Sequence, residues 1–151
     1  MFSIIRYKNS KYLSLRDGNN IEDESIITLL QTCTQLVHIS IKECRLITIF
    51  SIEKMKNIKY LSLQYCAPVY DIPIFNMINN CIYLEYLSLL NCGELTGQCV
   101  YDILNICKYI KILKFSNTNK IKQGTITDLL LLQFCKKLYP QLEELQLNFQ
   151  Q

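Results

Sequence analysis

Eight cysteines are the residues of this 151-residue chain with the widest chemical repertoire, because thiolates bind metals, attack electrophiles and form disulfides. They are Cys33, Cys44, Cys66, Cys81, Cys92, Cys99, Cys107 and Cys135. No two are spaced C-x-x-C and the only histidine is His38, so we expect no metal site of the zinc type. We also expect no secreted disulfide scaffold, because the chain is long and apolar and its N-terminus lacks a signal peptide.

His38, Ser40 and Glu43 are the best candidates for a catalytic group. A nucleophile needs a base in hydrogen-bond contact and a third group to orient that base. Side chains two residues apart on a strand run parallel and rarely meet this requirement. The sequence also holds no phosphate-binding loop, paired carboxylates or cofactor motif, so we expect neither an enzyme nor a cofactor.

Composition favours a folded protein and argues against nucleic-acid and membrane partners. Half of the residues are hydrophobic and 19% are charged, which suits a single domain over residues 1–151. The net charge of +3 is too small for a nucleic-acid-binding stripe. The longest apolar run, residues 129–132, is too short to cross a bilayer, so we expect an intracellular protein, cytoplasmic or nuclear, with no membrane or nucleic-acid partner.

One short phrase recurs along the chain and follows the pattern L-x-x-L-x-L-x-x-C loosely. Its copies are SKYLSLRDG, LVHISIKEC, IKYLSLQYC, LEYLSLLNC, IKILKFSNT and LEELQLNFQ. The anchor residues Leu13, Ile39, Leu61, Leu87, Leu113 and Leu145 are 26, 22, 26, 26 and 32 residues apart. Self-similarity at such a period is typical of repeat architectures.

Each phrase alternates with period two, which predicts a strand, and the segments between phrases change to a helical period. Ile26, Leu29, Leu30 and Cys33 share one helical face, and Val100, Ile103, Leu104 and Cys107 share another, with Thr96 as the expected N-cap. The last linker places Ile126, Leu130 and Phe134 on one face. The second linker, residues 45–57, is short enough to hold only a partial turn, and Pro68 and Pro73 predict an irregular entry to the third.

Units of one strand and one helix bury their apolar faces only by stacking. We therefore predict an α/β fold: a curved, right-handed solenoid of about six units, with a parallel sheet on the concave side and helices on the convex side. Leu61 and Leu87 should point into the core.

The phrases resemble leucine-rich repeats of the cysteine-containing subtype, found in F-box/LRR proteins and in the antagonist-of-mitotic-exit-network family. Cys44, Cys66 and Cys92 match the cysteine that ends the subtype's phrase. Cys33, Cys81 and Cys107 match a second cysteine, three residues before the unit's first leucine or isoleucine. The resemblance covers nearly the whole chain and implies reduced thiols that form turns and pack, whereas Cys99 and Cys135 lie outside both positions.

The same resemblance implies a substrate receptor for a cullin-type ubiquitin ligase. We find no F-box, the module that docks on a Skp-type adaptor, so this adaptor is expected only if an F-box exists elsewhere. Polar caps, which repeat arrays normally need, are also missing, which suggests a fragment or a subunit completed by a partner.

The outward strand positions form three columns that we predict to bind a protein partner through the concave face. The binding residues in the first four phrases are Tyr12, Ser14, Arg16, His38, Ser40, Lys42, Tyr60, Ser62, Gln64, Tyr86, Ser88 and Leu90. An aromatic column would stand beside a shallow groove lined by serine hydroxyls, and Lys114, Glu144 and Gln146 change its character in the last two phrases. A tyrosine ladder can also form simply because strand neighbours pack. The alternative function is a non-enzymatic scaffold or assembly subunit unrelated to ubiquitin.

Overall fold

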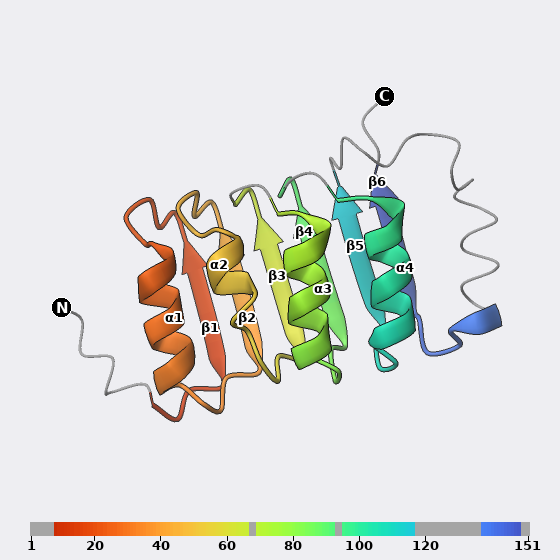
Figure 1. Cartoon of the computed structure of the whole chain (residues 1–151), viewed down its shortest axis with the longest axis horizontal. Helices are drawn as coiled ribbons and strands as arrows, with labels where there is room; N and C mark the ends of the chain where they lie inside the picture. The colour runs from red at the N-terminus through yellow and green to blue at the C-terminus, as the bar shows by residue number, and fades with distance from the viewer. Residues whose placement is uncertain (1–7, 67–68, 93–94, 117–136, 149–151) are drawn as a thin grey trace.

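The computed structural model describes residues 8–66, 69–92, 95–116 and 137–148 of the chain. Strands and helices alternate along most of it (Figure 1). The strands are β1 (Tyr12–Arg16), β2 (His38–Lys42), β3 (Tyr60–Gln64), β4 (Tyr86–Leu90), β5 (Ile112–Ser116) and β6 (Glu144–Asn148). The helices are α1 (Asp23–Thr32), α2 (Ile49–Ile52), α3 (Asp71–Asn80) and α4 (Gly97–Ile106). The predicted helix with Ile126, Leu130 and Phe134 lies outside the described residues.

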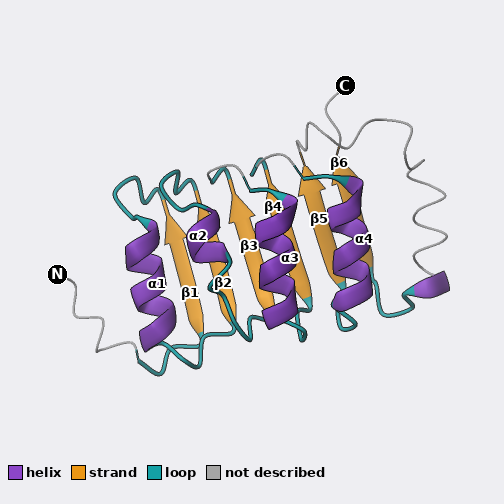
Figure 2. Cartoon of the chain, in the orientation of Figure 1, coloured by secondary structure: helices purple, strands orange, loops and turns teal. Residues whose placement is uncertain are grey.

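The six strands form one parallel sheet in sequence order, β1-β2-β3-β4-β5-β6. The register aligns the six predicted anchor residues in a single row, with Leu61 opposite Ile39 on one side and Leu87 on the other. The four helices lie together on one face of the sheet (Figures 1 and 2). The predicted parallel α/β architecture is therefore confirmed, and it is compatible with a solenoid.

The core lies between the sheet and the helix layer, because strand alternation turns every second side chain toward the helices. Leu61 and Leu87 are both fully buried there, as predicted. The predicted helix faces also point inward, and Val100, Ile103 and Leu104 of α4 are all buried. At about 25 cal/mol per Å² of buried apolar surface, this continuous layer is the main stabilising term of the fold.

Neighbouring helices are joined at their N-termini by an aspartate of one unit and a threonine of the next. Thr96, the predicted N-cap of α4, accepts a hydrogen bond from the Gln98 backbone N–H. Its own backbone N–H donates to Asp71 Oδ1 at 2.9 Å and its hydroxyl donates to Asp71 Oδ2. Thr48 makes the same pair of bonds to Asp23, with 2.7 Å between N and Oδ1.

The predicted irregularity at Pro73 is absent, since Pro73 is buried in the first turn of α3. Backbone N–H groups in a first helical turn have no intrahelical acceptor, so a proline there removes no hydrogen bond. Pro68 lies outside the described residues. The prediction of a partial turn in the second linker is confirmed, because α2 has only four residues.

A left-handed residue follows each of the first four strands. Asp17, Glu43, Tyr65 and Asn91 have φ between 52° and 56°. The next residue is Gly18 in the first unit and a cysteine in the other three. A Cβ at Gly18 would stand 2.6 Å from Ile21 Cδ1 and 3.0 Å from Cys44 Sγ, so a side chain there would require these two neighbours to shift.

Candidate functional site

The aromatic column forms a ladder of rings on the face of the sheet that the helices leave open. Tyr12, His38, Tyr60 and Tyr86 are direct partners in the parallel register. The His38 and Tyr60 rings stack with centroids 3.8 Å apart, and the Tyr60 and Tyr86 rings stack at 3.9 Å. Tyr12 tilts against His38 at 5.4 Å and is 72% exposed. Parallel pairing repeats one side chain at each strand spacing, which stacks these rings as a continuous column.

Stacking changes the electrostatics of the two inner rings. Burial between its neighbours lowers the pKa of His38, because the imidazolium form loses hydration there. Burial and the adjacent Tyr86 hydroxyl raise the pKa of Tyr60 to about 12. Both rings are therefore neutral near pH 7, and the ladder presents ring edges and hydroxyls.

The serine column does not form the predicted groove lined by hydroxyls. Ser62 is 3% exposed and Ser88 is fully buried, whereas Ser14 is exposed and Ser40 is half-buried. Longer side chains stand two residues before and after every one of these serines, but β3 and β4 lie in the middle of the sheet with neighbours on both sides, whereas β1 is an edge strand. Ser62 and Ser88 are therefore covered and Ser14 is not. Gln64 Nε2 donates to Ser62 Oγ at 3.4 Å, and the Ser88 hydroxyl has no hydrogen-bond partner among the described residues.

The third column changes from cationic to neutral along the sheet. Arg16 Nε lies 3.6 Å from Asp17 Oδ2, and Lys42 Nζ lies 3.5 Å from Glu43 Oε1. Gln64 and Leu90 follow at the same register positions on β3 and β4, both half-buried. The predicted columns are thus three aligned rows, and their cations are partly neutralised by the adjacent carboxylates.

The surface differs beyond β4. Ile112 continues the aromatic row on β5, and Glu144 takes that place on β6. Lys114 Nζ lies 2.8 Å from Glu144 Oε1, and this hydrogen bond raises the pKa of the lysine. The aromatic ladder therefore ends at Tyr86.

His38 does not engage the groups that catalysis would require. Its ring lies between Tyr12 and Tyr60, and Glu43 is engaged by Lys42. Within the described part of the chain, no hydrogen bond joins His38 to Ser40 or Glu43. Among the described residues, these three side chains therefore form no hydrogen-bonded pair of nucleophile and base.

Cys44, Cys66 and Cys92 occupy equivalent turns at the ends of neighbouring strands. Their thiols donate to backbone carbonyls, Cys44 to Lys42 at 3.3 Å, Cys66 to Gln64 at 3.5 Å and Cys92 to Leu90 at 3.2 Å. Cys66 is the half-buried member of the three. Its interaction with the Cys92 side chain lowers the pKa of Cys66. Burial raises the pKa of Cys44, and the adjacent Cys66 together with burial raises that of Cys92.

The second predicted cysteine position is the C-cap of a helix. Cys33, Cys81 and Cys107 cap α1, α3 and α4, and all three are buried. Cys99 is buried too, in α4, and Cys135 lies outside the described residues. The seven described cysteines form no disulfide, and no three His, Cys, Asp or Glu side chains among the described residues gather as a metal site would require.

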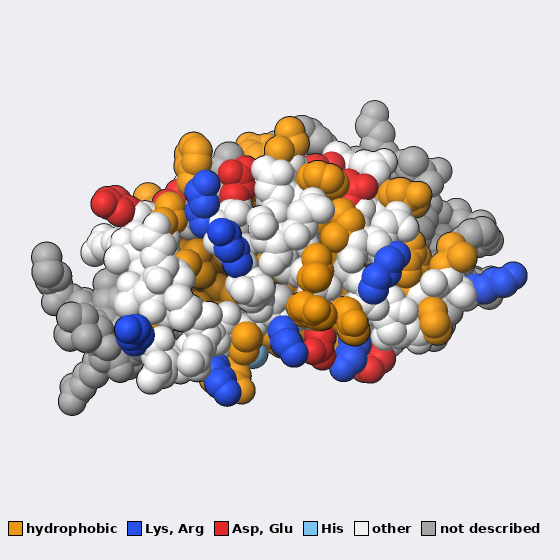
Figure 3. All heavy atoms as spheres, turned by 60° about the horizontal axis from the view of Figure 1, so that its bottom comes forward, with side chains coloured by type: hydrophobic (Ala, Val, Ile, Leu, Met, Phe, Trp, Pro, Cys, Tyr) orange, Lys and Arg blue, Asp and Glu red, His pale blue; other side chains and the backbone are white. Residues whose placement is uncertain are grey.

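The helix-covered face carries a set of exposed apolar side chains that the sequence patterns did not single out. Figure 3 shows hydrophobic side chains on this face and along its lower edge, with lysines and acidic residues between them. The most exposed ones on α3, α4 and the loops after them are Ile72, Phe75, Ile82, Tyr83, Tyr101 and Tyr109. A helical wheel could have found Ile72 and Phe75, since they interrupt the polar side of α3.

No helix among the described residues is long and apolar enough to cross a membrane. The chain matches no protein-family model and no curated protein at a significant level.

Proposed function

We propose that the chain is a leucine-rich-repeat solenoid of the cysteine-containing subtype that binds a partner protein through the open, concave face of its sheet. The observation that carries the proposal is the aromatic ladder. Four rings line up on a face that the hydrophobic core does not use. Tyrosine is among the residues most enriched at binding hot spots, because it offers a rigid apolar ring with a polar tip.

The shape of the ladder favours a protein partner over a small molecule. Stacked neighbours cover the faces of His38 and Tyr60, so neither ring is open to sandwich an inserted group. The buried Ser62 and Ser88 leave no deep groove beside them. What remains is a broad wall of ring edges and hydroxyls, bordered by Leu90 and Ile112, which suits the flat surface of another protein.

The resemblance to F-box/LRR proteins extends this proposal to ubiquitin ligases. The bound protein would be a substrate, and a Skp-type adaptor would take part only through an F-box. The alternative is a scaffold or assembly subunit without a link to ubiquitin. In either case the proposed role is non-enzymatic, without cofactor or metal, in the cytoplasm or nucleus.

Affinity capture with a matched pair of double variants tests the binding face. Tyr60→Ala with Tyr86→Ala removes the two stacked central rings. Tyr83→Ala with Tyr109→Ala removes an exposed ring pair, with centroids 5.4 Å apart, from the edge where the helices end. We expect the first variant to lose its specific partners while the second keeps them, since a hot-spot aromatic contributes on the order of 2 kcal/mol to binding.

Circular dichroism should show both variants folded, because the four tyrosines are half-buried or exposed. Recovery of the same partners by the Tyr60/Tyr86 variant would exclude the open face as the binding surface. Co-purification of a Skp-type adaptor with the wild type favours the ligase role, and a stable complex that lacks one favours the scaffold.

A further inference from the structure

The helix layer has a gap over the second unit. Ile39 and Leu61 are 22 residues apart, whereas the units on either side have 26, and the missing length is taken from the helix. Helix α2 has four residues and α1, α3 and α4 have ten each. After α2 the chain runs to β3 without further helix, so part of α1 has no helix beside it.

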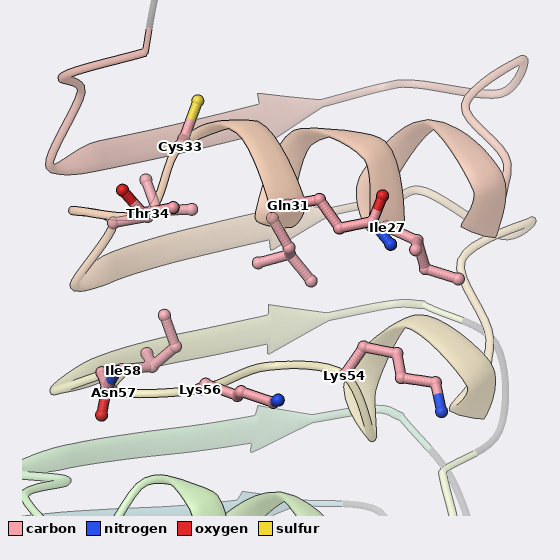
Figure 4. A pocket seen from close by; sticks show the side chains of 10 residues that line it. Ile27, Gln31, Cys33, Thr34, Lys54, Lys56, Asn57 and Ile58 are labelled. Carbon is pink, nitrogen blue, oxygen red and sulfur yellow. The ribbon is translucent and has the colours of Figure 1, made fainter.

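A groove of about 350 Å³ occupies this gap, between α1 and the segment that leads from α2 into β3 (Figure 4). Ile27 and Gln31 come from α1, and Lys54, Lys56 and Ile58 come from the opposite side. The volume lies within the range of small-molecule sites, about 300–1,000 Å³. A ligand with a short apolar body would fit, and a folded domain would not.

The lining of the groove is largely apolar. Buried Leu36 and Ile58 contribute to it, together with the half-buried Ile27 and Leu30 of α1. Ile26 is the only buried residue of α1, while α3 and α4 have four each. Ile27 and Leu30 thus leave apolar surface of α1 partly open to solvent on the side that faces the short α2.

Two lysines give the groove its charge. Lys54 and Lys56 both line it, and none of its lining residues is acidic. Within the described residues, neither ammonium group lies in an ion pair, whereas Lys59 and Lys111 at the nearby edge share Glu85. The polar lining groups Gln31, Thr34 and Asn57 can all donate hydrogen bonds. An apolar wall with cations and donors beside it is complementary to an anion that carries a hydrocarbon body.

We propose that this groove binds a small amphipathic carboxylate, with its apolar body against Leu30, Leu36 and Ile58 and its carboxylate at Lys54 and Lys56. The site lies on the helix side of the molecule and is independent of the protein-binding face. A straight-chain fatty acid of medium length combines the required body and charge.

Calorimetric titration with octanoate tests the proposal, with octanol and octylamine as ligands of the same length but different charge. We expect saturable binding of octanoate, weaker binding of octanol and none of octylamine. In amide NMR spectra the shifts should centre on residues 27–36 and 54–58. The affinity should fall as salt rises, because the lysines are exposed.

Three variants test whether Lys54 and Lys56 bind the carboxylate of octanoate. Lys54→Gln with Lys56→Gln should weaken octanoate binding by about fivefold to tenfold, the value of two exposed ion pairs. Gln31→Glu, which keeps the shape and adds a negative charge to the wall, should weaken it as well. Lys11→Gln with Lys108→Gln removes the same charge from exposed sites outside the groove and should leave binding unchanged.

Several results would overturn the proposal. They are a failure of octanoate to saturate, equal affinities for octanoate and octanol, and an unchanged affinity in the Lys54/Lys56 variant. Binding of an acidic peptide in place of octanoate would also overturn it and would reassign the groove to a protein ligand. All these substitutions lie at exposed positions, so the fold should persist in each variant.

Discussion

Tyr60 and Leu61 are adjacent in the sequence and serve opposite faces of the same strand. Leu61 is fully buried in the core, and Tyr60 stacks in the ladder on the open face. Alternation alone assigns these two roles, because successive strand residues point to opposite sides. A change at one of them should therefore affect stability and a change at the other should affect binding.

Leu61→Ala should destabilise the fold by about 2–5 kcal/mol, since it removes buried methyl groups and leaves a cavity. Leu13→Ala is the matched change at the same row on β1, where the leucine is only half-buried, and should cost less. Urea unfolding of both variants measures the difference. Equal losses would mean that the row is not packed as described.

His38 should make stability depend on pH. Its pKa is lowered in the folded state, so folding favours the neutral ring, and the contribution is complete above the unfolded pKa of about 6.5. As the pH falls through the folded pKa, this contribution is lost, because the unfolded state binds the extra proton.

His38→Phe keeps a ring in the ladder and removes the titration. The free energy of unfolding of the wild type, measured at intervals from pH 8 to pH 5, should fall more steeply than that of this variant. Parallel curves would show that the imidazole is equally hydrated in both states.

The thiols should differ in reactivity. Cys66 is half-buried and its thiolate is stabilised by the Cys92 thiol, whereas burial raises the pKa of Cys81 to about 11 and that of Cys107 to about 12. Iodoacetamide at pH 8 should therefore modify Cys66 before Cys81, Cys92 and Cys107. Peptide mass spectrometry measures the order, and labelling in guanidinium should abolish it. Prior modification of Cys92 would contradict the assignment.

At the scale of elements, the Asp71–Thr96 contact is the clearest link between neighbouring helices. Thr96→Ala should cost about 1 kcal/mol through loss of the N-cap alone. Combined with Asp71→Ala in a double-mutant cycle, it should show a coupling energy of about 0.5 kcal/mol or more, because each residue bonds directly to the other. Asn79→Ala, at an exposed amide that donates to the Phe75 carbonyl within α3, is the control and should not couple to Thr96, because the two side chains share no partner.

Sequence patterns predicted the strands and helices well, but they predicted poorly which surfaces of these elements are exposed. Alternation around the anchor residues predicted every strand and its register, and i, i+3, i+4 spacing predicted the buried faces of α1 and α4. The spacing of 22 residues predicted a short α2 without indicating that a groove would open beside α1. The burial of Ser62 and Ser88 was missed because it also depends on the strands that pair on either side, which alternation within one strand does not specify.

At the scale of the whole molecule, contacts run from each unit to the next. The extensive contacts within a layer join only elements that follow one another, such as β3 with β4 or α3 with α4. Opening should therefore begin at the outer strands of the described sheet. In hydrogen exchange, the amides of β3 and β4 should be the slowest and those of β1 the fastest. Equal protection of β1 and β4 would indicate a single cooperative unit.

The left-handed residue after each of the first four strands affects the stability of the chain. A side chain at positive φ costs roughly 1–2 kcal/mol relative to the right-handed region, with aspartate and asparagine the best tolerated. Asp17 and Asn91 suit the position, whereas Glu43 and Tyr65 do not. Replacing Glu43 or Tyr65 with glycine would therefore remove this conformational cost and raise the free energy of unfolding, without altering a contact of the core.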